Sequence, residues 1–150
     1  MLAALVALGT VLAVPARVDA QIKFEVFDNK FGSARSPWTP TLKVIRSEEE
    51  LQALWSSLGR YVAPPDVDFR SHVVIAYFLG LRPTGGYRLE AERVEIRAGT
   101  MTVHLIEVTP GECCGTAQTA TLPEIMISTI PWKGPVSVEV RREPRSCCMQ

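Results

Sequence analysis

The sequence is poor in several features on which common functions depend. It has only two histidines, His72 and His104, a single asparagine, Asn29, and no excess charge, since 16 basic residues balance 16 acidic ones. Without a basic excess there is no electrostatic reason to bind nucleic acid or an anionic membrane. Gly-x-Ser-x-Gly, His-Glu-x-x-His and a Gly-rich phosphate loop entering a helix are all absent. We therefore expect no enzymatic activity, no cofactor and no bound metal.

The few titratable residues that are present fit structural roles. His104 alternates with Thr102 along a strand-like segment, which predicts a partly exposed sheet residue. Asp66 and Asp68 lie close together in a loop, but two carboxylates are too few for a calcium site.

The first twenty residues are interpreted as a signal peptide. Leu2 to Val14 form an apolar run, and Val18 and Ala20 stand at the −3 and −1 positions of a cleavage site before Gln21. The run is shorter than the roughly 20 apolar residues of a membrane-spanning helix. The sequence therefore predicts a secreted, periplasmic or cell-envelope protein with residues 21–150 as one domain and no membrane span after cleavage.

The cysteines form two adjacent pairs, Cys113-Cys114 and Cys147-Cys148. Zinc ligands are usually paired at spacings of two to four residues, and a redox dithiol prefers Cys-x-x-Cys. Metal and redox roles stay open as alternatives, but an exported protein favours structural disulfides. We expect a bridge between the two pairs, without fixed connectivity.

Hydrophobic patterns predict a mainly β (α+β) fold, an antiparallel sandwich or curled sheet with one amphipathic helix. The run "HVVIAYFLG" has the composition of a buried central strand, and "YRLEAERVEIR" alternates with a phase slip near Glu92-Arg93 that predicts a β-bulge. Short connections predict mainly antiparallel pairing. Further strands are expected in "IKFEVF", "TLKVI", "GTMTVHLIEV", "TATLPEIMISTI" and "VSVEVRR".

The helix has clear boundary signals. Ser47 is a suitable N-cap, and Glu50 three residues later completes a capping box. The apolar stripe expected to face the sheet is Leu51, Leu54, Trp55 and Leu58, with Gly59 as the end.

The segment between the buried strand and the bulged strand is longer than a tight turn requires. From its residues alone it is either a wide hairpin turn with a glycine bulge or a rigid binding loop, because Arg and Tyr are frequent at binding hot spots. We expect partner contacts here and at a second aromatic on the "IPWKG" turn, which could share the same end of the sheet. The candidate residues are Arg82, Pro83, Thr84, Gly85, Gly86, Tyr87 and Trp132.

Three stretches resemble the C-terminal domain of the protease complex subunit PrcB family: "VIRSEEELQALW", "PPDVDFRSHVVIAYFLGLRPTGGYRLE" and "TPGECCGTAQTATLPEIMISTIP". The Arg-Pro-Thr-Gly-Gly-Tyr element is the most specific part. The resemblance covers residues 42–140 and implies an exported, non-catalytic protein-binding module that acts as an accessory or stabilising subunit of a protease complex.

A second resemblance gives an alternative. Chagasin-type inhibitors of cysteine proteases carry, in order, Asn-Pro-Thr-Thr-Gly-Tyr, a Gly-rich loop and Arg-Pro-Trp. Here the order is "RPTGGY", "PGECCG" and "IPW". This resemblance implies an inhibitor of cysteine proteases that inserts three neighbouring loops.

Overall fold

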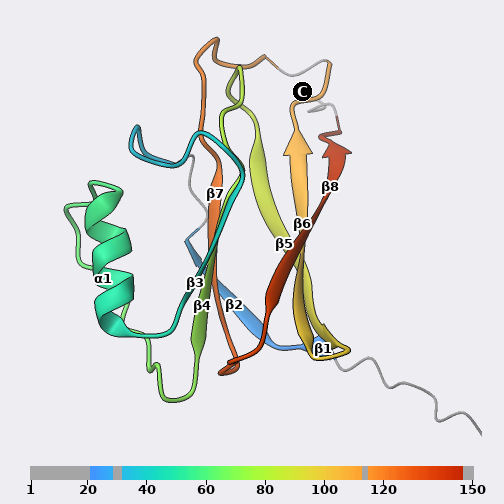
Figure 1. Cartoon of the computed structure of the whole chain (residues 1–150). Coiled ribbons are helices and arrows are strands. Elements are labelled where there is room, and N and C mark those ends of the chain that lie inside the picture. The colour runs from blue at the N-terminus through green and yellow to red at the C-terminus, as the bar shows by residue number, and fades with distance from the viewer. Residues whose placement is uncertain (1–20, 29–31, 113–114, 147–150) are drawn as a thin grey trace, which may run out of the picture.

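A computed structural model describes residues 21–28, 32–112 and 115–146 and shows two four-stranded sheets packed as a sandwich, with a helix against one of them (Figure 1). The first sheet has the strand order β1-β5-β6-β8, and the second has the order β2-β7-β4-β3. The predicted mainly β class is confirmed. The elements are β1 (Gln21–Ile22), β2 (Phe24–Asp28), β3 (Thr41–Ile45), α1 (Glu48–Ser57), β4 (Val73–Phe78), β5 (Arg88–Arg97), β6 (Thr100–Thr109), β7 (Glu124–Thr129) and β8 (Val136–Pro144).

Helix α1 begins and ends at the predicted residues. The Ser47 hydroxyl accepts a hydrogen bond from the Glu50 N–H at 3.2 Å, and the Glu50 carboxylate in turn accepts from the Arg46 N–H at 2.7 Å. The first bond satisfies a backbone donor that the first helical turn leaves without a partner, and the second ties the Glu50 side chain to the residue before the N-cap. Gly59 follows the helix with a φ of 67°, a conformation that glycine adopts without steric cost.

Two apolar layers lie on the two faces of β4, which explains why this strand has no polar side. Val74, Ala76 and Phe78 contact the buried stripe of α1, whereas Ile75 and Leu79 face the first sheet. Alternate residues of a strand point to opposite faces, so a strand covered on both faces is continuously apolar. The prediction of a buried central strand is confirmed.

The predicted bulge in β5 is also present. The β5–β6 register shifts between Ala91 and Arg93, so Leu89 and Val94 both reach the core although the alternation breaks between them. The strands join through Ala98 and Gly99, with φ values of 47° and 78°, as a two-residue hairpin requires.

Most other connections differ from expectation because they cross between the sheets. β4 lies in the second sheet and β5 in the first. Segment 79–87 therefore connects the two sheets, and it is not the wide hairpin turn that the sequence allowed. Its length is explained by the distance between two packed sheets, about 10 Å. The chain crosses again from β6 to β7 and back to β8, and β8 therefore pairs parallel with β6 in an otherwise antiparallel arrangement.

Candidate functional site

Segment 80–87 lies at one end of the sandwich and is held firmly by segment 117–121. Arg82 and Thr121 exchange two backbone hydrogen bonds of 2.8 and 2.9 Å, and the Gly85 N–H donates to the Ala117 carbonyl at 2.8 Å. The Thr121 hydroxyl donates to the Thr84 carbonyl at 3.0 Å. The predicted rigid loop is thus ordered by the chain itself.

Two of the three glycines of this segment, Gly85 and Gly86, are closely packed against other parts of the molecule. Gly86 has a φ of 88°, and a Cβ atom there would lie 3.1 Å from the side chains of Pro110 and Thr116. A Cβ at Gly85 would lie 3.3 Å from the Ala117 Cβ. The sequence suggested that a partner's backbone approaches these glycines, but the neighbouring segment of this chain already fills that space.

Arg82 is engaged by a buried carboxylate. Its Nε donates to Glu107 Oε1 at 2.7 Å, and Arg142 Nε donates to Glu107 Oε2 at 3.0 Å. Glu107 is 3% exposed. Burial alone would raise the pKa of Glu107, but the hydrogen bonds and charges of the two arginines outweigh it and hold the pKa below the ordinary value of 4.5. Arg82 therefore ties the loop to the first sheet.

Tyr77 lies beside this ion-pair cluster on the inner face of β4. Burial raises the pKa of its phenol above the ordinary value of 10.0; the charge of Arg82 lowers it and that of Glu107 raises it further. The cluster thus spans both sheets, because Tyr77 belongs to one and Glu107 to the other.

The exposed apolar groups at this end come from two loops. Leu81 is 42% exposed and Pro83 is exposed, while Thr84 and Tyr87 are half-buried. Trp38, 67% exposed, joins them because its carbonyl accepts a hydrogen bond from the Leu81 N–H at 3.0 Å. We name Trp38, Leu81 and Pro83 the apical surface. Sequence reasoning missed Trp38, although a tryptophan in a loop of small and polar residues is a usable signal.

The turn from β7 to β8, which carries Trp132, lies at the opposite end of the sandwich (Figure 1). β7 runs from Glu124, opposite Phe78, to Thr129, opposite Val73, so the turn after β7 lies at the start of β4 and away from the loop that follows it. The Trp132 Nε1–H donates to the Pro135 carbonyl at 3.0 Å, and its ring packs against the core between the sheets. The expectation that the "IPWKG" turn shares an end with Arg82–Tyr87 is wrong. Pro110, the first residue of the "PGECCG" segment, does lie at this end, since a Cβ atom on Gly86 would be 3.1 Å from its side chain.

The disulfide prediction falls outside the described residues. Cys113, Cys114, Cys147 and Cys148 are all in segments that the structure does not describe. A tether between the two pairs stays a prediction.

His104 is buried rather than partly exposed. It is 8% exposed, with Nε2 at 2.8 Å from Glu95 Oε1 and Nδ1 at 3.3 Å from Glu139 Oε2. Long side chains of β5 and β8 cover it, which strand alternation alone did not reveal. A hydrogen bond from His104 lowers the pKa of Glu95 below its ordinary value. The carboxylates of Glu95 and Glu139 contact the two different nitrogens of the His104 ring. Within the described ranges, no group of three or more His, Cys, Asp or Glu side chains is arranged so that it could hold a metal ion.

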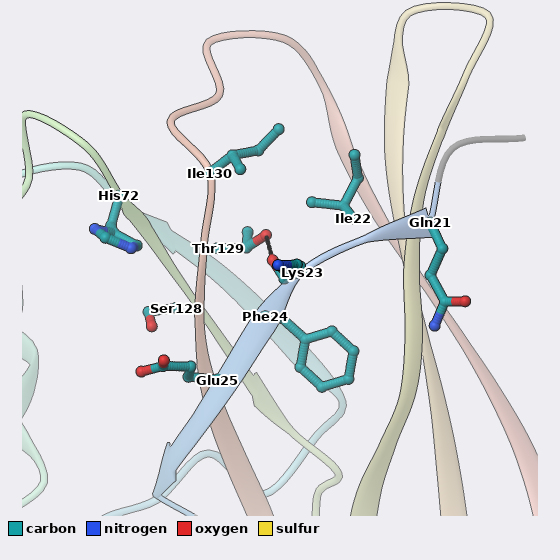
Figure 2. Close-up of a pocket in the computed structure, with 9 residues that line it drawn as sticks. All are labelled: Gln21, Ile22, Lys23, Phe24, Glu25, His72, Ser128, Thr129 and Ile130. Atoms are coloured by element: carbon teal, nitrogen blue, oxygen red, sulfur yellow. Dashed lines mark hydrogen bonds between the residues drawn. The ribbon is translucent and has the colours of Figure 1, made fainter.

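One open pocket has a volume of about 620 Å³ (Figure 2). It lies where the chain passes from β1 to β2, and the Thr129 hydroxyl donates to the Lys23 carbonyl at 2.8 Å beside it. No candidate residue from the sequence lines this pocket. The lining residues are Gln21, Ile22, Lys23, Phe24, Glu25, His72, Ser128, Thr129 and Ile130.

Among the residues that the structure describes, no helix is long and apolar enough to cross a membrane.

Comparison with known proteins gives one match. The model of the family described as PrcB C-terminal matches residues 73–129, from the first residue of β4 to the last of β7. The matched region includes the whole cross-sheet loop and its partner segment, and it confirms the resemblance drawn from the sequence. No curated protein and no solved structure matches the chain.

Proposed function

Because residues 73–129 match the model of the PrcB C-terminal family, whose name suggests a role in a protease complex, we propose that this protein is an exported, non-catalytic accessory subunit that binds and stabilises a protease. The family match carries the proposal. The apolar run before Gln21 supports export to the cell envelope, and the absence of known catalytic motifs supports a binding role.

The apical surface is the docking site that the geometry favours. Trp38 and Leu81 offer exposed apolar contacts, and Pro83 limits the conformational entropy lost on binding. The hydrogen bonds to segment 117–121 and the Arg82–Glu107 ion pair hold the loop in one conformation before a partner arrives. Arg82, Thr84 and Tyr87 support this surface from below rather than forming its outermost contacts.

The inhibitor alternative loses its geometric basis. It requires three loops side by side to enter a protease cleft, and Trp132 lies at the other end of the sandwich from Arg82 to Tyr87. We therefore assign the loop to stable docking and not to active-site blockage.

The test is affinity purification of the full chain from the producing cells, followed by mass spectrometry of the proteins that co-purify. We expect an exported protease or a subunit of its complex. The double variant Trp38→Ala/Leu81→Ala should weaken that binding about thirtyfold, since a hot-spot side chain typically contributes about 2 kcal/mol or more. The matched control Val26→Ala/Ile130→Ala truncates two other exposed apolar side chains and should bind normally.

Two outcomes would count against the proposal. Recovery of no protease component would remove the accessory role, whereas normal binding by Trp38→Ala/Leu81→Ala would place the docking site elsewhere. Inhibition of a papain-like enzyme by the pure protein would restore the alternative.

A further inference from the structure

Among the residues that the structure describes, β8 is an edge strand with one side free of strand partners, because it ends the order β1-β5-β6-β8. Its parallel pairing with β6 begins where the Pro135 carbonyl accepts from the Met101 N–H at 3.0 Å and ends where the Arg145 N–H donates to the Thr109 carbonyl at 2.9 Å. Alternate residues of a paired strand direct their backbone groups to the same neighbour. The odd-numbered residues therefore bond to β6, and Val136, Val138, Val140 and Arg142 direct their backbone groups to the free side.

The charges on this edge are arranged symmetrically about Val140. Glu139 and Arg141 flank it on the outer face of the sheet, with side chains 70% and 50% exposed. Each also contacts its own chain, Glu139 at His104 and Arg141 at both Glu92 and Glu143, and these contacts hold both side chains on that face. Charged residues on an edge strand usually prevent pairing. Opposite charges on either side of one residue instead match a second copy of the same strand running the other way.

We propose that two copies of this chain form a dimer by antiparallel pairing of their β8 edges, with the two-fold axis through Val140. In this register Val140 exchanges two backbone hydrogen bonds with Val140 of the second copy, and Val138 pairs with Arg142. Glu139 then lies directly opposite Arg141 of the second copy, in the closely spaced type of antiparallel pair. The two first sheets become one continuous sheet.

Charge disfavours three of the neighbouring registers, and a fourth, with the axis through Val138, places Glu139 opposite Ser137 and forms no opposite-charge pair. An axis through Glu139 or Arg141 places like charges directly opposite each other, and an axis through Arg142 places two guanidinium groups there. If one strand is shifted by a single residue relative to the other, odd-numbered residues lie opposite even-numbered ones. A residue whose backbone groups face β6 then lies opposite one whose groups face outward, so the hydrogen bonds between the strands cannot form. The contact is isologous and closes at two copies, so it predicts a dimer and not a fibre.

The test compares charge variants of the full chain by sedimentation equilibrium. The unmodified chain should dimerise reversibly, and non-reducing gels show that the dimer is not covalent. Glu139→Arg places two arginines opposite each other, Arg141→Glu places two glutamates opposite each other, and each alone should weaken the dimer about tenfold or more. Mixed together, these two variants regain both opposite-charge pairs and should form heterodimers, seen by native mass spectrometry.

Three further variants separate strand pairing from other effects. Val140→Pro removes an outward N–H without touching the β6 ladder, so it should abolish the dimer. Val140→Ala also loses the side chain that packs against the core but keeps this N–H, so it is the matched control and should still dimerise. Glu25→Arg makes the same charge change as Glu139→Arg at an exposed position of the second sheet, away from β8, and should dimerise normally. The proposal is overturned if the unmodified chain is monomeric at all concentrations, if the mixed variants do not associate, or if Val140→Pro remains dimeric.

Discussion

Two buried glutamates each bind two segments that are far apart in the sequence. Glu107 receives Arg82 from the cross-sheet loop and Arg142 from β8, while Glu124 receives Ser36 and Arg60. Glutamate is rarely buried without charged or hydrogen-bonded partners, and here each carboxylate has both oxygens occupied. These two side chains therefore fix the loops at the end of the sandwich that carries the apical surface.

The variant Glu124→Gln tests how much the buried ion pair between Glu124 and Arg60 contributes to stability. Glu124 is 1% exposed and its carboxylate pairs with Arg60, whose guanidinium also lies 4.1 Å from the centre of the Trp55 ring. Glutamine keeps the shape but not the charge, so we expect the free energy of unfolding to fall by about 3 kcal/mol. Urea denaturation measures it. The exposed Glu25→Gln is the control, and an equal effect in both variants would show that the buried pair contributes nothing specific.

The pKa of Glu107 predicts how stability depends on pH. Because the folded protein holds this pKa below 4.5, the contribution of Glu107 is complete above that pH and is lost as the pH falls through the folded pKa. Glu107→Gln should therefore be less stable than the unmodified chain at neutral pH, and the gap should narrow on acidification. Urea midpoints across a pH series check this; a gap that widens toward low pH would contradict it.

At the scale of single elements, local signals determined much that was predicted correctly. The Ser47–Glu50 box, the apolar stripe of α1 and the phase slip in β5 act within a few residues and can be read directly. The sheet to which each strand belongs depends on packing between distant segments, and for that reason the 79–87 connection and the parallel β8 were not predicted. For the same reason Trp38 was missed and His104 was wrongly expected to be partly exposed, since the exposure of a side chain is set by neighbours from other elements.

Ser47→Ala tests the helix boundary. The hydroxyl satisfies the Glu50 N–H, and its loss should lower the free energy of unfolding by about 1 kcal/mol. Ser56→Ala, at an exposed position in the same helix, is the matched control and should be neutral or slightly stabilising because alanine has the higher helix propensity. Similar losses in both variants would argue against a capping role.

Two glycines with similar backbone angles allow the packing of the cross-sheet loop to be measured. Gly86 and Gly99 have φ values of 88° and 78°, but only Gly86 has atoms near the position of an added Cβ. Both alanine variants carry the cost of a positive φ, about 1 kcal/mol. Gly86→Ala should cost more, because Pro110 or Thr116 must also move. Thermal denaturation of the Gly86→Ala and Gly99→Ala variants gives the difference in their melting temperatures. Equal melting temperatures would mean that Pro110 and Thr116 can move away from the added methyl group without cost.

At the scale of the whole molecule, the two ends of the sandwich have different roles. The end with the apical surface has exposed apolar side chains above a network of ion pairs, whereas at the other end Trp132 is half-buried, against the core and over Gly134. A rigid sandwich separates binding from folding, because loops at one end can contact a partner without changing the core.

The two partly exposed tryptophans should therefore respond in opposite ways to truncation. Trp132→Ala removes a ring that closes the core and loses its hydrogen bond to Pro135, so it should destabilise the fold by about 2 kcal/mol and leave partner binding unchanged. Trp38→Ala, with 67% of the residue exposed, should leave the melting temperature nearly unchanged and weaken binding. Acrylamide quenching of the intact complex adds a direct test, because a docked partner should shield Trp38. If quenching is unaltered and Trp132→Ala is the variant that loses binding, docking occurs at the end that carries the "IPWKG" turn, and the roles assigned to the two ends must be exchanged.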